Sequence, residues 1–79
     1  MNFEDIEFPV YRRYKNGRSY FKIINPRKFE EVRALGSQRI ISLIEARQFP
    51  EMNFIRDMVF NFSEMAEEIP AAEYEEFKG

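Results

Sequence analysis

The sequence predicts an α+β fold of order ββαββα, in which four mainly antiparallel strands carry two short helices on one face of the sheet. Two observations predict it. An Asn16-Gly17 dipeptide lies between two segments rich in aromatic and β-branched residues, which is the pattern of a β-hairpin. After the hairpin, a helix pattern at 26–35 is followed by strand patterns at 37–48 and 54–62 and by a second helix pattern at 71–78.

The turn determines the predicted register of the hairpin. Asn-Gly favours a two-residue type I′ turn, whose twist matches that of the strands it joins. The expected pairs are Lys15–Arg18, Tyr14–Ser19, Arg13–Tyr20, Arg12–Phe21, Tyr11–Lys22 and Val10–Ile23. A three-residue loop with a bulge at Gly17 is the alternative, and it would shift the pairing by one residue.

Side chains alternate between the two faces of such a hairpin. One face is apolar except for one arginine, and it comprises Phe8, Val10, Arg12, Tyr14, Phe21 and Ile23. The other face is aromatic and cationic and contains no acidic residue. Its members are Tyr11, Arg13, Lys15, Arg18, Tyr20 and Lys22. We call these six residues the hairpin face, and they form the candidate binding surface.

The helix predicted over 26–35 rests on its two ends. Asn25 suits the N-cap and Pro26 the first helical position. Ile24 and Phe29 have the spacing of a hydrophobic staple across that N-terminus. Gly36 is placed to end the helix.

The next segment, 37–48, is rich in isoleucine and is predicted to be a strand. Ile40 and Ile44 share one face, and Ile41 and Leu43 share the other. Because both faces begin apolar, the first half of this strand is expected to be central and covered on both sides.

A second strand is predicted over 54–62 and a single helical turn over 63–68, ended by Pro70. The terminal helix over 71–78 places Tyr74 and Phe77 on its inward side.

Length and composition predict one small domain over 1–79, with 1–7 as a frayed lead-in to which Phe3 and Ile6 could add packing. The acidic N-terminus has no apolar stretch of the kind found in secretory signals, and no segment has the apolar length of a membrane span, so a cytoplasmic location is expected. The absence of cysteine excludes disulfides and thiolate metal sites. The absence of histidine removes the commonest metal ligand, and no metal or cofactor is expected.

Net charge is −2, but the charges are unevenly distributed. From residue 11 to residue 39 there are nine Lys or Arg and two acids, whereas from 45 to 79 there are nine acids and three Lys or Arg. Attraction between the two halves, within one fold or across a dimer, is the simpler explanation. The other is a basic surface for an anionic ligand.

Catalytic motifs are not recognisable. The four serines have no histidine to activate them, and three glycines at 17, 36 and 79 cannot form a phosphate-binding loop. The adjacent glutamates at 30–31, 67–68 and 75–76 would point in different directions on a helix. We therefore expect a non-catalytic protein.

Three functions follow, in order of expectation. The first is a protein-interaction or self-association module using the hairpin face, since Tyr and Arg are enriched where interface energy concentrates. The second is nucleic-acid binding by the same face, with its tyrosines stacking on bases, although the pI near 5.2 opposes it. An enzyme is third. A purely structural explanation of the face is that Tyr11 and Tyr20 pack across strands while the cations are solvated.

Overall fold

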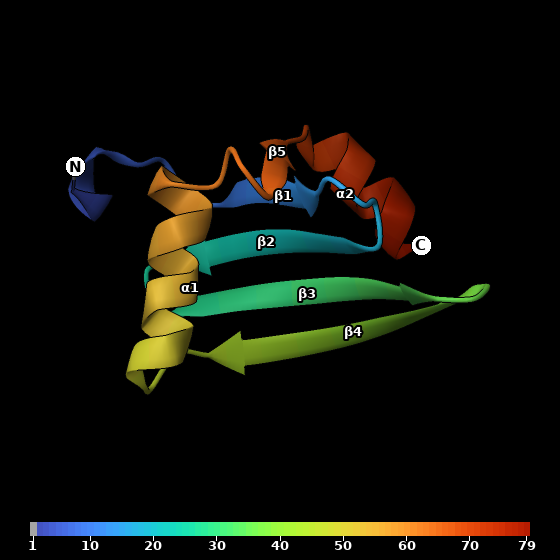
Figure 1. The fold of residues 1–79 in the computed structure, drawn as a ribbon, viewed down its shortest axis with the longest axis horizontal. Coiled ribbons are helices and arrows are strands. Elements are labelled where there is room, and N and C mark those ends of the chain that lie inside the picture. The colour runs from blue at the N-terminus through green and yellow to red at the C-terminus, as the bar shows by residue number, and fades with distance from the viewer. Residues whose placement is uncertain (1) are drawn as a thin grey trace.

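The computed structural model describes residues 2–79, and Met1 lies outside the described residues. It contains a five-stranded antiparallel sheet and two α-helices (Figure 1). In chain order the elements are a 3-10 helix Phe3–Asp5, β1 Val10–Tyr14, β2 Ser19–Asn25, β3 Lys28–Leu35, β4 Gln38–Glu45, α1 Phe49–Phe60, β5 Ala66–Glu68 and α2 Ala71–Lys78. Across the sheet the order is β4-β3-β2-β1-β5. The predicted α+β class is confirmed, but the predicted ββαββα order and four strands are wrong.

The predicted hairpin is confirmed as β1 and β2. Their ladder consists of Val10–Ile23, Tyr11–Lys22, Arg12–Phe21 and Arg13–Tyr20, in the predicted register. The turn differs from the predicted type I′, because only Gly17 has a positive φ, of 73°. The Gly17 N–H donates to the Tyr14 carbonyl at 2.8 Å, and the ladder ends before the predicted Tyr14–Ser19 and Lys15–Arg18 pairs.

The predicted helix over 26–35 is wrong, because this segment is strand β3. The Asn25 side chain accepts a hydrogen bond from the Arg27 N–H at 2.8 Å, so the residues expected to start a helix form a turn instead. β3 then pairs with β2 on one side and with β4 on the other. Ladders on both edges outweigh the helix preference of residues such as Glu31 and Ala34.

The strand predicted over 37–48 is confirmed as β4, but its predicted central position is wrong. Gly36 and Ser37 form a two-residue turn, and φ is 60° at Gly36 and not positive at Ser37, as in a type II′ turn. This turn places β4 beside β3 at the outside of the sheet, at the lower edge in Figure 1. Ile41 and Leu43 are therefore 48% and 59% exposed.

The strand predicted over 54–62 is also wrong, because residues 49–60 form α1. Ile55, Met58 and Val59 recur at helical spacing and are buried. Pro50 lies in the first turn, and the Glu51 carboxylate accepts from the Arg47 N–H at 3.1 Å. The helical turn predicted over 63–68 is replaced by the short strand β5, whereas the terminal helix is confirmed as α2.

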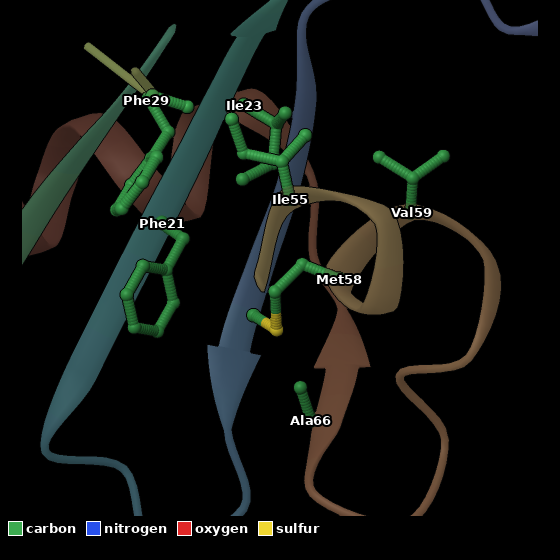
Figure 2. Packing of buried hydrophobic residues seen from close by; sticks show 8 residues of the cluster. Phe21, Ile23, Phe29, Ile55, Met58, Val59 and Ala66 are labelled. Atoms are coloured by element: carbon green, nitrogen blue, oxygen red, sulfur yellow. The ribbon is translucent and has the colours of Figure 1, made fainter. Parts of the chain in front are cut away.

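The two helices pack on opposite faces of the sheet, and the prediction that they share one face is wrong. β2 is the reason, because its side chains alternate between two buried faces. Phe21 and Ile23 lie in the cluster formed with α1 (Figure 2), while Tyr20 lies in the cluster formed with α2. At the N-terminus, Phe3 and Ile6 pack against the α1 cluster.

Arg12 is the one charged side chain on the apolar face of the hairpin. It is 6% exposed, its Nε donates to the Met58 carbonyl at 2.8 Å, and its guanidinium lies 4.0 Å from the centre of the Phe62 ring. Burial lowers the pKa of this guanidinium, and the nearby Glu68 carboxylate opposes that effect. The Met58 carbonyl is in the last turn of α1, so Arg12 also stabilises the negative end of that helix.

Replacing Ile55 by valine tests the α1 cluster, because Ile55 is fully buried. We expect Ile55→Val to lower the free energy of unfolding by about 1 kcal/mol through the loss of one buried methylene. The matched control is Ile41→Val, the same change at a position that is 48% exposed, for which a change of less than about 0.5 kcal/mol is expected. Urea denaturation of dilute protein measures both, and equal effects would contradict this packing.

Candidate functional site

The aromatic part of the hairpin face is covered by α2. Tyr20 is 9% exposed, and its ring is stacked on Phe77 with ring centres 3.7 Å apart. Tyr11 contacts Tyr74, with ring centres 5.3 Å apart. Both tyrosines proposed to meet a partner therefore already contact aromatic rings of their own chain.

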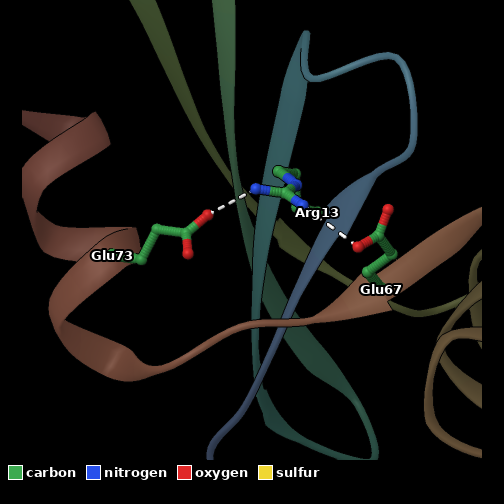
Figure 3. Close-up of polar contacts among 3 residues, drawn as sticks. All are labelled: Arg13, Glu67 and Glu73. Atoms are coloured by element: carbon green, nitrogen blue, oxygen red, sulfur yellow. Dashed lines mark hydrogen bonds and ion pairs between the residues drawn. The ribbon is translucent and has the colours of Figure 1, made fainter.

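Arg13 of the hairpin face joins three elements. Its guanidinium forms ion pairs with Glu67 of β5 at 3.1 Å and with Glu73 of α2 at 2.7 Å (Figure 3). A cation of the basic segment is thus paired with two acids of the acidic segment. These contacts are the attraction between the two halves that the charge distribution predicts.

The other three cations of the hairpin face lie apart from this cluster. Lys22 is half-buried and is paired across the ladder with Glu30 of β3. Lys15 and Arg18 are exposed at the turn between β1 and β2. The six predicted residues therefore do not form one open surface.

A second polar cluster fixes the other end of α2. The Tyr74 hydroxyl donates to Glu30 Oε1 at 2.6 Å, and Lys78 Nζ lies 3.0 Å from the same oxygen. Burial alone would raise the pKa of Glu30, but the hydrogen bonds from Tyr74 and Lys78 outweigh it and hold this pKa below its ordinary value of 4.5. Burial and the Glu30 carboxylate together raise the pKa of Tyr74, so its hydroxyl stays protonated and donates.

The most exposed apolar strand is β4, which sequence reasoning did not select as a site. Its free edge and the side chains on the α2 side of the sheet form what we call the β4 edge surface, whose side chains are Arg39, Ile41, Leu43 and Glu45. Arg39 donates from Nε to the Phe77 carbonyl at 3.0 Å, and Glu45 accepts from Arg47 at 2.8 Å. The arrangement is an apolar centre between a cation and an anion on a strand whose outer edge no described strand pairs.

A signal for this surface was present in the sequence. The run Ile40 to Ile44 contains no charge and no proline, and it is apolar on both faces. It is predicted to be a central strand because both of its faces begin apolar, and the segment after it, 54–62, is predicted to be a further strand. That segment forms α1, so no described strand covers the outer edge of β4.

Several small surface hollows complete the description. One of about 280 Å³ lies where β3 and β4 meet and is lined by Asn25, Arg27, Lys28, Glu45, Ala46 and Arg47. Within residues 2–79, no three acidic side chains are grouped so that they could hold a metal ion. In the same part of the chain, no helix has both the length and the apolar character needed to cross a membrane.

The Glu30 cluster makes stability depend on acid pH. A carboxyl whose pKa is lowered by folding contributes stability that is present above its ordinary pKa of 4.5 and is lost as the pH falls through the lowered value. We expect the free energy of unfolding of Glu30→Gln to fall less steeply below about pH 4.5 than that of the parent protein. Urea denaturation at neutral and acid pH measures this, and Glu64→Gln, an exposed loop residue, is the control. Identical slopes for the parent and Glu30→Gln would contradict the assignment.

Comparison with known proteins adds no family to these observations. The chain matches no protein-family model, no curated protein and no solved structure. The surfaces of the chain itself are therefore the basis for the functional proposal that follows.

Proposed function

We propose that this protein is a small, non-catalytic protein-interaction module that binds an extended polypeptide segment along β4. The single observation that supports this best is the free outer edge of the eight-residue β4, a strand on which Ile41 and Leu43 are 48% and 59% exposed. An added strand would pair with the free N–H and C=O groups of β4 and would cover these side chains at the same time. This is the β-augmentation mode of recognition.

The opposite edge of the sheet supports the choice by contrast. β5 has three residues, and two of them, Glu67 and Glu68, are exposed acids. Short length and charge are two ordinary ways in which proteins prevent pairing at a sheet edge. β4 has neither protection between Ile40 and Ile44, so it is the edge suited to a partner.

The hairpin face is less suited to the role first predicted for it. Its tyrosines are packed under α2, and Arg13 is paired with two glutamates. Nucleic-acid binding by this face remains a prediction without further support, because the Tyr20 ring that would stack on a base is stacked on Phe77. The self-contacts support a structural role for this part of the face, but one in which the tyrosines pack on α2 and Arg13 is ion-paired, rather than the predicted cross-strand packing with solvated cations.

Peptide selection tests the proposed module. Random peptides displayed on phage are selected on the immobilised protein, and binding of the enriched peptides is measured by fluorescence anisotropy. We expect Leu43→Lys to weaken binding at least about tenfold, because it places a charge in the centre of the β4 edge surface.

The matched control for that experiment is Leu35→Lys. Leu35 is 58% exposed, against 59% for Leu43, but it lies on β3 and its side chain points to the α1 side of the sheet. Binding should survive this change. The proposed function is wrong if the protein binds no peptide and does not self-associate at concentrations up to about 1 mM. It is also wrong if Leu43→Lys leaves the peptide affinity unchanged.

A further inference from the structure

The hydrogen-bonding phase of β4 follows from its turn. In a two-residue hairpin the residues that flank the turn, here Leu35 and Gln38, form a hydrogen-bonded pair. Even-numbered residues of β4 therefore bond to β3, and the Ala46 N–H, which donates to the Arg27 carbonyl at 2.7 Å, continues this phase. The backbone groups of Arg39, Ile41, Leu43 and Glu45 point to the free edge.

These four residues are complementary to themselves. In an antiparallel pairing of β4 with another β4, centred on Ser42, Arg39 of one copy lies opposite Glu45 of the other. Ile41 of one copy lies opposite Leu43 of the other, and Ser42 lies opposite Ser42. Two-fold symmetry repeats each contact, so the pairing has two ion pairs outside two apolar pairs.

We propose that the segment bound by β4 is the β4 of a second copy of this chain, paired antiparallel in the register centred on Ser42. This inference rests on the proposed function and names its partner. The outward N–H and C=O groups of both copies then pair with each other. The exposed Ile41 and Leu43 side chains of both copies meet on the α2 side of the sheet.

Charge selects this register over its neighbours. Moving the centre to Leu43 places Arg39 opposite Arg47, and moving it to Ile41 places Arg39 opposite Leu43 and Glu45 opposite Ser37. Like charges that face one another across a ladder destabilise the pairing. A shift of the pairing by one residue would place side chains from the α1 side of one copy beside side chains from the α2 side of the other.

The proposed dimer also accounts for the exposed apolar side chains of β4. Ile41 and Leu43 are exposed in one copy on the α2 side of the sheet. In the dimer each lies beside an apolar side chain of the other copy. Assembly would stop at the dimer, because the two outer edges of the combined sheet are the short, acidic β5 strands.

Charge reversal tests the pairing through sedimentation equilibrium over a range of concentrations. We expect the parent protein to dimerise. We expect Arg39→Glu alone and Glu45→Arg alone each to weaken the dimer at least about tenfold, because each places two like-charge pairs across the interface. An equimolar mixture of the two variants should form a heterodimer within about threefold of the parent affinity, since both of its cross-strand pairs are again Arg–Glu.

The mixture separates this pairing from effects within one copy. Arg39→Glu removes the contact of Arg39 with Phe77 in every copy that carries it, and the second variant does not restore this contact. Rescue in the mixture therefore requires contact between copies. Arg18→Glu is the matched control, an equal charge change at the exposed β1–β2 turn, and it should leave dimerisation unchanged. Circular dichroism and thermal denaturation establish that each variant is folded.

The outcomes distinguish the two proposals. A parent protein that stays monomeric while its selected peptides still need Leu43 overturns the second copy as partner and leaves the proposed module intact. The register centred on Ser42 is overturned if neither charge reversal weakens the dimer. It is also overturned if the mixture of the two variants does not recover the affinity of the parent dimer. A monomer that binds no peptide overturns both proposals.

Discussion

The structure depends on β2 being buried on both faces. Phe21 and Ile23 are in contact with the α1 cluster, while Tyr20 on the opposite side is stacked on α2. A strand with two apolar faces needs cover on both sides of the sheet. The helices must therefore lie on opposite faces. The sheet is the middle layer of three, whereas the predicted fold has two layers, with both helices on one face.

This arrangement gives the hairpin face a structural task. Stacking of Tyr20 on Phe77, pairing of Arg13 with Glu73 and the hydrogen bond from Tyr74 to Glu30 all attach α2 to the sheet. An eight-residue helix is too short to be stable by itself, so it needs such contacts. The aromatic and cationic composition that suggests a binding site in the sequence serves the packing of the chain's own C-terminal helix.

Two short helices cannot cover five strands. Both contact β2, the central strand, and the outer edge of β4 keeps its backbone groups unpaired. The proposed function and the proposed dimer both begin from this incomplete cover. Arg39 and Glu45 on either side of an apolar centre give that edge a polarity that an antiparallel copy matches.

The sequence by itself determined the first hairpin, its register and faces, the strand at β4 and the helix α2, because each has a local signal such as Asn16-Gly17 or the stripe of Tyr74 and Phe77. Tertiary structure alone decided β3 and β5, since pairing with neighbouring strands outweighs the weak local preference of these segments. For α1, the buried spacing of Ile55, Met58 and Val59 was present in the sequence, but its aromatic and β-branched residues also fit a strand. The local sequence could not predict that β4 has a free edge, because whether a strand is central depends on which distant segments become its neighbours.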